Sequence, residues 1–147
     1  MATSTAAPAP IPASPYLARM AQASSCPLCS PLPAAVVAES EWCLALRDGH
    51  PLGPGHTLVV PKRHVASVFD LTGEEWADLW AMVRRVRGMV PELSGADALN
   101  VGVNDGPAAG QTVLHAHVHL IPRRMGDVPD PRGGVRWVLP QKAKYWP

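Results

Sequence analysis

The sequence lacks a long hydrophobic run, has almost no net charge and contains few cysteines. No apolar stretch approaches the roughly 18 residues of a membrane span, so we expect no membrane partner. The 13 lysines and arginines nearly balance the 12 acidic residues, and the net charge of +1 argues against nucleic acid as a partner. The three cysteines are an odd number, and we recognise no secretory signal before them. We therefore expect a cytoplasmic protein in a reducing compartment.

A chain of 147 residues, 47% of them hydrophobic, is large enough for one domain with a hydrophobic core. Residues 1–14 are rich in alanine, proline and serine and have the composition of a disordered leader. The domain is then expected over 15–147, with a basic tail at its C-terminal end. Ser14 followed by Pro15 is typical of a helix start and predicts a short helix to about Ser24.

One long helix is predicted in the middle of the chain. Thr72 and Glu75 have the spacing of a capping box, in which each side chain binds the backbone amide of the other residue. Pro91 ends the helix. Apolar residues follow at helical spacing, and we expect them, including two tryptophans, to face the core rather than a ligand. These residues are Trp76, Leu79, Trp80, Val83 and Val86.

Short apolar segments between turns predict five strands. Since the connections are mostly of the hairpin type, neighbouring strands are expected to run antiparallel. The fold class is therefore α+β, a five-stranded, mostly antiparallel sheet with one main helix and the short N-terminal helix. The strands are expected at 35–38, 42–46, 56–61, 99–104 and 111–122.

Three of the six histidines, His115, His117 and His119, occupy alternate positions in the last of these strands. Side chains alternate between the two faces of a strand, so the three imidazoles are expected on one face, about 6.6–7 Å apart. The apolar residues around them then face the core. These are Leu114, Ala116, Val118 and Leu120.

Three interpretations of such a row of histidines are open. A solvent-exposed row without function needs all three side chains to share a face by chance. A metal site needs a further ligand besides two histidines at i and i+2, and an open position for water. Nucleophilic catalysis uses a neutral imidazole, which attacks phosphorus near pH 7. The turn at 104–112 favours the third interpretation, because its backbone amides and polar side chains suit phosphate oxygens.

The segment GQTVLHAHVHLIPRR resembles the signature of the histidine triad family, His-x-His-x-His with apolar residues between the histidines. The preceding NDGPAAGQTV is similar to the fragile-histidine-triad branch of dinucleoside polyphosphate hydrolases. The upstream CLALRDGHPLGPGHTLVVPKRH and the Gly-Asp after the triad extend this similarity to about residues 26–127. The resemblance implies the histidine triad fold and hydrolysis of the α-phosphate linkage of a dinucleoside polyphosphate.

The resemblance also implies a role for each residue of the triad. His117 would attack the α-phosphorus and become a nucleotidyl-histidine, which water hydrolyses to a nucleoside monophosphate. His119 would contact the phosphate or the leaving-group oxygen, and His115 would flank the nucleophile. Gln111 would hold a phosphate oxygen and help to place the water. Histidine rather than glutamine at position 119 favours hydrolysis over transfer to a sugar phosphate, the reaction of the related nucleotidyltransferase branch.

Five further residues match nucleotide-binding positions of the family. Asp48 would bind the ribose hydroxyls, which suits a carboxylate that accepts from two neighbouring donors. Leu46 would contact the base, and His56 would keep the catalytic histidines oriented. Thr112 and Asn104 would bind phosphate or support the site. Asp48 also fits a simple turn residue, and Asn104 a loop cap.

Three alternatives to this function are retained. Nucleoside phosphoramidates would be hydrolysed through the same intermediate, and a metalloenzyme would use the histidines as ligands. A nucleotide-binding module would keep the pocket with little turnover. The resemblance further implies a homodimer, paired through the helix and an edge strand, and allows a divalent cation that accompanies the polyphosphate.

Cys26 and Cys29 form a CxxC pair, which is a signal for zinc but needs two more ligands to complete a tetrahedral site. The resemblance implies that His64 and His115 complete a structural zinc site beside the active site. His115 is then less free to contact the substrate. Two free cysteines are the alternative, and Cys43, on a predicted strand, is expected to be a small buried residue.

Residues 121–147 are basic, and the tail, 123–147, has too many prolines and glycines for regular structure to be expected. Its aromatic residues Trp137, Tyr145 and Trp146 are expected to anchor it. We interpret this tail either as a solvated segment or as a basic lip for an anionic substrate. Six cations are set against two aspartates: Arg123, Arg124, Arg132, Arg136, Lys142 and Lys144 against Asp127 and Asp130.

Overall fold

The computed structural model of the chain describes residues 26–147. The leader expected at 1–14 and the helix expected at 15–24 lie outside the described residues. Within the described part, no helix is both long enough and apolar enough to cross a bilayer.

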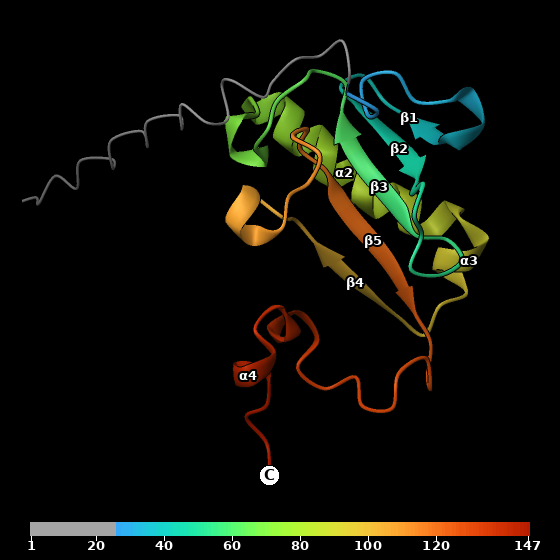
Figure 1. The fold of residues 1–147 in the computed structure, drawn as a ribbon. Helices are drawn as coiled ribbons and strands as arrows, with labels where there is room; N and C mark the ends of the chain where they lie inside the picture. Colours follow the sequence, from blue (N-terminus) through green and yellow to red (C-terminus); the bar gives the residue numbers. More distant parts are fainter. Residues whose placement is uncertain (1–25) are drawn as a thin grey trace, which may run out of the picture.

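A five-stranded sheet forms the centre of the fold (Figure 1). Its strand order is β1-β2-β3-β5-β4, and every pair of neighbours is antiparallel. The expected α+β class with five strands is therefore confirmed, in a sheet that is antiparallel throughout. The strands are β1 (Val36–Glu39), β2 (Cys43–Arg47), β3 (Thr57–Pro61), β4 (Ala98–Gly102) and β5 (Val118–Arg123).

Helix α2 (Gly73–Met89) lies across one face of the sheet (Figure 1). Side chains alternate along each strand, so residues such as Leu58 and its neighbour across the ladder, His119, face away from α2. The face opposite the helix therefore carries the strand histidine. The buried residues between sheet and helix include Ala45, Val59, Val118 and Leu120 from the strands and Leu79, Met82 and Val86 from α2.

The start of α2 is fixed by the capping box expected from the sequence. The Thr72 hydroxyl accepts from the backbone N–H of Glu75 at 3.2 Å, and the Glu75 carboxylate accepts from the N–H of Thr72 at 2.9 Å. The same carboxylate accepts two hydrogen bonds of 2.7 Å from Arg63. These donors, Arg63 first, lower the pKa of Glu75 to about 2. The helix ends at Met89, shortly before Pro91, as expected.

The expectation that both tryptophans of α2 lie in the core is wrong. Trp76 and Trp80 are 38% and 37% exposed, and Phe69 is 72% exposed. The ring centroids of Phe69 and Trp76 are 6.1 Å apart, and those of the two tryptophans are 5.9 Å apart. The side of α2 that faces the sheet begins with Glu75 and continues with Leu79. Each tryptophan is one residue further along, and successive side chains of a helix point about 100° apart, so both tryptophans point away from the sheet. We call Phe69, Trp76 and Trp80 the aromatic patch.

The fifth strand is shorter than expected, because it begins at Val118 and not at the start of 111–122. Its pairing with β3 also begins at Val118. Before this point the backbone bonds to a loop instead, and the N–H of Ala116 donates to the carbonyl of Val65 at 2.6 Å. Of the three triad histidines, His119 lies in the strand and the other two are placed by local contacts.

The C-terminal tail contains two short helical segments, η5 (Gly134–Val138) and α4 (Pro140–Ala143), where no regular structure was expected. Two ion pairs within the tail reduce the positive charge available for a basic lip, and these are Arg123–Asp127 and Arg132–Asp130. Short helical turns elsewhere are η2 (Pro33–Ala35), η3 (Val68–Asp70), α3 (Pro91–Ser94) and η4 (Pro107–Ala109).

Candidate active site

Two of the triad histidines line a cavity on the face of the sheet opposite α2. Its volume of about 570 Å³ is within the range of pockets that hold small-molecule ligands. The cavity also collects side chains from the β2–β3 loop and from the turn before the triad. Of the residues expected at a nucleotide site, it is lined by Asp48, His56, Asn104, Thr112, His117 and His119.

His117 is oriented by a backbone contact. Its Nδ1 lies 2.7 Å from the carbonyl oxygen of His115. A carbonyl oxygen can only accept, so Nδ1 carries the proton and donates it. In the neutral ring the other nitrogen, Nε2, then has a free lone pair. The backbone thus holds His117 in the tautomer that a nucleophile needs.

A chain of hydrogen bonds sets the opposite tautomer in His119. The backbone N–H of Leu52 donates to Nδ1 of His56 at 3.1 Å, so the neutral His56 ring carries its proton on Nε2. That Nε2 lies 2.9 Å from Nδ1 of His119, which therefore accepts. The proton of the neutral His119 ring is then on Nε2. The cavity is lined by one ring with a lone pair and another ring with an N–H.

Asp48 lies beside the His56–His119 pair. Its Oδ2 is 3.3 Å from Nε2 of His56 and 3.9 Å from Nδ1 of His119, and its Oδ1 accepts from the N–H of His50 at 2.7 Å. Burial lowers the pKa of His56 and of His119, nearby His117 lowers the second further, and Asp48 opposes both shifts. Both shifts favour the neutral form of the two rings.

Gln111 does not line the cavity, so its expected contact with phosphate and water is not supported. Both ends of its buried amide are used within the protein, because Oε1 accepts from Gly106 at 2.8 Å and Nε2 donates to the carbonyl of Ala66 at 2.7 Å. Several backbone amides of the turn are also bonded within it. The turn was expected to offer a row of free backbone amides to the cavity. It contributes mainly the side chains of Asn104 and Thr112 instead.

The apolar wall of the cavity contains Leu28 and Leu58, not the expected Leu46. Leu46 is buried in a cluster with Leu58 and Val60. The segment after His56 is almost continuously apolar and shows no alternation of apolar and polar residues, so the sequence did not indicate that Leu58 faces the site. Leu28 lies next to the cysteine pair, where no periodic pattern exists.

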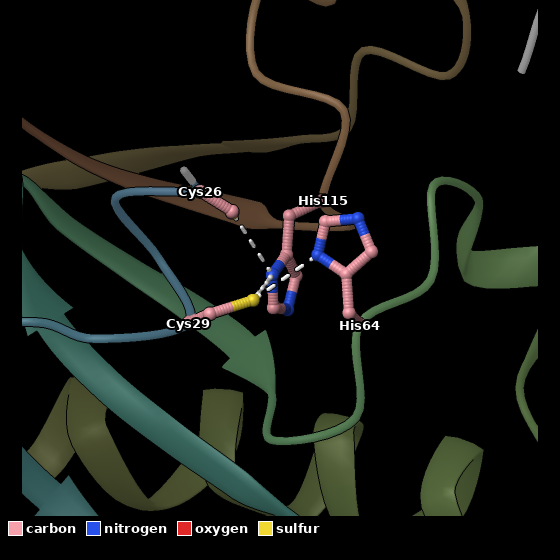
Figure 2. Close-up of side chains that lie close together, drawn as sticks. All are labelled: Cys26, Cys29, His64 and His115. Atoms are coloured by element: carbon pink, nitrogen blue, oxygen red, sulfur yellow. Dashed lines mark hydrogen bonds between the residues drawn. The ribbon is translucent and has the colours of Figure 1, made fainter. Parts of the chain in front are cut away.

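A second cluster, at the other end of the triad, is shown in Figure 2. It contains Cys26, Cys29, His64 and His115, whose ligand atoms all lie within 4.8 Å of one another. Nδ1 of His115 is 3.5 Å from Cys26 Sγ and 3.4 Å from Cys29 Sγ, and Nδ1 of His64 is 3.1 Å from Cys29 Sγ. Around a tetrahedral zinc ion with usual bond lengths, sulfur and nitrogen ligands are about 3.5 Å apart. The four residues therefore fit zinc in donor type, number and spacing.

His115 belongs to this second cluster and does not line the cavity. Its side chain is fully buried, and its Nε2 donates to the carbonyl of Pro61 at 2.7 Å, so Nδ1 has the lone pair that faces the sulfurs. A direct contact of this ring with substrate is not supported. His115 acts on the site through its carbonyl, which orients His117.

Burial and the neighbouring Cys26 raise the pKa of Cys29 to about 11, so metal binding must displace its proton.

Comparison with known families agrees with this geometry. Residues 30–126, more than half of the chain, match the family model described as the HIT domain. The chain belongs to the HIT family. The matched residues include all three histidines that predicted the family from the sequence.

Curated proteins similar to the HIT chain include two hydrolases. It is 46% identical over 88 residues to a bis(5'-adenosyl)-triphosphatase from Dictyostelium discoideum, covering 60% of this chain and 59% of that protein. It is 48% identical over 77 residues to an asymmetrical bis(5'-nucleosyl)-tetraphosphatase from Schizosaccharomyces pombe, covering 52% of this chain and 42% of that protein. The HIT chain thus spans about half the length of these relatives.

Solved structures of similar proteins share the fold. A Zn-bound histidine triad family protein from Mycobacterium smegmatis is 36% identical, with a TM-score of 0.63 over 74% of the HIT chain and 86% of that protein. A diadenosine triphosphate hydrolase from Plasmodium falciparum is 27% identical, with a TM-score of 0.62 over 68% of each chain. The expected histidine triad fold is confirmed.

Proposed function

We propose that this HIT chain hydrolyses dinucleoside polyphosphates at the α-phosphate through a nucleotidyl-histidine intermediate. The observation that carries this proposal is the pair of opposite tautomers, in which His117 has a lone pair and His119 an N–H at the same cavity. The names of the relatives from Dictyostelium and Schizosaccharomyces support this class of substrate.

The reaction proceeds in two steps. In the first, Nε2 of His117 bonds to the α-phosphorus, and the bond from phosphorus to the bridging oxygen breaks, the oxygen leaving with the electron pair. The ring keeps its Nδ1 proton and becomes positively charged, a charge stabilised by the carbonyl of His115 at 2.7 Å. In the second step water attacks the phosphorus, the P–N electron pair returns to Nε2, and the proton of the water passes to solvent. A nucleoside monophosphate is released.

The neutral state of His119 indicates which leaving group suits the site. At pH 7 the ring has one proton on Nε2, because burial lowers its pKa, and it donates this as a hydrogen bond without transferring it. A departing nucleoside diphosphate or triphosphate needs no more than a hydrogen bond, since a terminal phosphate has a second pKa of about 6. An amine leaving group needs a full proton. The site therefore favours polyphosphates over phosphoramidates.

A substrate panel tests this proposal. The purified protein is incubated with diadenosine triphosphate, diadenosine tetraphosphate and adenosine 5'-phosphoramidate, and the nucleotides are separated by chromatography. We expect AMP with ADP from the first substrate and AMP with ATP from the second, and hydrolysis of the phosphoramidate slower by about 100-fold. Faster hydrolysis of the phosphoramidate would assign that class instead. Binding of all three compounds without turnover would indicate a nucleotide-binding module.

We also propose that Cys26, Cys29, His64 and His115 bind a structural zinc ion. The spacing of their ligand atoms supports this, and a similar protein from Mycobacterium smegmatis is described as Zn-bound. When bound, the ion supplies a cross-link and no chemistry at the phosphate. It ties the cysteine segment to His115, whose carbonyl orients the nucleophile.

We further propose that the chain forms a homodimer through the aromatic patch and β4. Strand β4 is at the edge of the sheet, with β5 as its neighbouring strand and η5 of the tail in contact with it. An edge strand presents unpaired backbone groups along its open side, and a second copy can pair with these. The aromatic patch is contiguous apolar surface, which is typical of an interface. The dimer implied by the family resemblance would cover both.

A further inference from the structure

The cavity extends across the sheet on both sides of the reactive histidines. Toward β2 and β3 it is lined by Leu28, Leu58 and Asp48, which suit the base and the sugar of the reacting nucleotide. Strand β5, which contains His119 and directly follows His117, lies in the middle because it separates β3 from β4 in the sheet. Toward β4 the cavity continues to side chains that have no role in the mechanism above.

The cavity is lined on the β4 side by Asn100, Ile121 and Val135, and by Leu52 of the β2–β3 loop, which also shares a second hollow with Asn100 and Ile121. We call these four residues the β4 subsite. Three of them are apolar. Leu52 and Val135 are also among the exposed large apolar residues of the described chain. Asn100 is the polar member, and its Oδ1 accepts from Arg123 at 2.6 Å, so its Nδ2 faces away as a donor. Apolar walls with one amide group suit a flat, heteroatom-bearing ring.

Val135 is brought to the cavity by the C-terminal tail. The tail is not part of the sheet and lies on the side of β4 away from β5, with η5 in contact with β4 (Figure 1). At Gly134 the backbone has a φ of +49°, and an added Cβ would lie in van der Waals contact with Nδ2 of Asn100, at 3.6 Å. Glycine adopts this positive φ without strain, so the tail can turn here and place Val135 at the cavity.

The tail is folded around its own side chains and can therefore act as a fixed wall. The indole N–H of Trp137 donates to the carbonyl of Arg132 at 2.8 Å, and the Arg132 guanidinium lies 4.8 Å from the ring centroid of Trp146. The guanidinium of Arg136 donates to the carbonyls of Lys142 and Ala143 at 2.7 Å and 3.0 Å. These contacts join η5 to the end of the chain.

We infer that the β4 subsite binds the nucleoside of the leaving group, an inference that rests on the proposed function. A dinucleoside polyphosphate carries a second base beyond the phosphates, and the bond that breaks lies beside His119, between the two halves of the cavity. The departing base packs between Val135 on the tail and Ile121 on β5, with its edge near Nδ2 of Asn100. The tail thereby makes the site selective for substrates with two nucleosides, without touching the phosphorus.

The test compares a substrate whose leaving group has a nucleoside with one whose leaving group has none. Diadenosine triphosphate releases ADP, and adenosine 5'-phosphorofluoridate releases fluoride. Val135→Ser removes apolar contact, and we expect kcat/KM for diadenosine triphosphate to fall by about fivefold, through KM. The value for the phosphorofluoridate stays unchanged. Val135→Leu keeps the wall and restores activity toward diadenosine triphosphate. Val138→Ser is the matched control, because Val138 is exposed on the same segment and does not line the cavity.

An equal loss for both substrates, no loss for either, or the same loss in Val138→Ser would overturn the inference. Calorimetric binding separates this failure from a failure of the proposed function. If the unchanged protein hydrolyses neither substrate, the proposed function is wrong. The β4 subsite is then tested by binding alone, and it requires a higher affinity for diadenosine triphosphate than for AMP. Val135→Ser must weaken the binding of the dinucleotide and leave that of AMP unchanged.

Discussion

His117 and His119 differ in the nitrogen that carries the proton, and this difference assigns their chemistry. A carbonyl holds the proton of His117 on Nδ1, and His56 holds that of His119 on Nε2. Replacing His117 by asparagine keeps an N–H donor but removes the nitrogen lone pair. We expect turnover of diadenosine triphosphate to fall by at least about 10⁴-fold, because no covalent intermediate forms. AMP should still bind in a calorimetric titration. Retained turnover would show that another group attacks the phosphorus.

His56 and His119 also connect the site to stability at acid pH. Burial lowers the pKa of both rings from the usual 6.5. Below pH 6.5 the unfolded chain therefore binds protons that the folded chain does not, and the free energy of unfolding decreases as pH falls. The decrease stops once pH is below the folded-state pKa values. We expect a lower urea midpoint at pH 5 than at pH 7.5, and a smaller difference in His56→Asn. The same difference in both proteins would contradict this coupling.

At the scale of elements, the segment with Cys26 and Cys29 is joined to the sheet through side chains of two other segments. Cys26→Ser removes one of the four proposed zinc ligands. We expect about one zinc per chain in the unchanged protein, a lower zinc content in the variant, and a melting temperature lower by about 5 °C or more. Metal content is measured by mass spectrometry and melting by calorimetry. Cys43→Ala is the control, because Cys43 is buried away from this cluster, as expected, and its loss should leave the zinc in place. Zinc-free unchanged protein would reject the metal site.

The elements that the sequence predicted well are those that depend on neighbouring residues. The start of α2 follows from Thr72 and Glu75, which are three residues apart and contact each other within one helical turn. The start of β5 depends instead on Val65, distant in sequence, which bonds the backbone of Ala116 and ends the alternation before Val118. A periodic pattern contains no information about such a partner.

The side chains of the site divide in the same way. His117 and His119 were found because the triad is a local motif, and both line the cavity. Gln111 belongs to that motif too, but the carbonyl of Ala66, a long-range partner, holds its amide away from the cavity. Val135 joins the site from the tail, and no spacing in the sequence connects it with the triad.

At the scale of the whole molecule, one face of the sheet is used for the cavity and the other for α2, which leaves the aromatic patch exposed beside the core. Two tryptophans with more than a third of their surface exposed are costly in water unless another surface covers them. Dimerisation that covers the aromatic patch would therefore stabilise the fold.

Charge placed on the aromatic patch tests the dimer. Trp76→Lys together with Trp80→Lys puts two like charges at the proposed interface, and we expect a dimer in the unchanged protein and a monomer in the variant by sedimentation velocity. Leu32→Lys, a change at an exposed residue just before β1, at the opposite edge of the sheet from β4, should remain dimeric. Because contacts within the chain orient His117 and His119, the monomeric variant should keep the product pattern of the substrate panel. A variant that sediments like the unchanged protein would assign the aromatic patch to a surface outside the dimer contact.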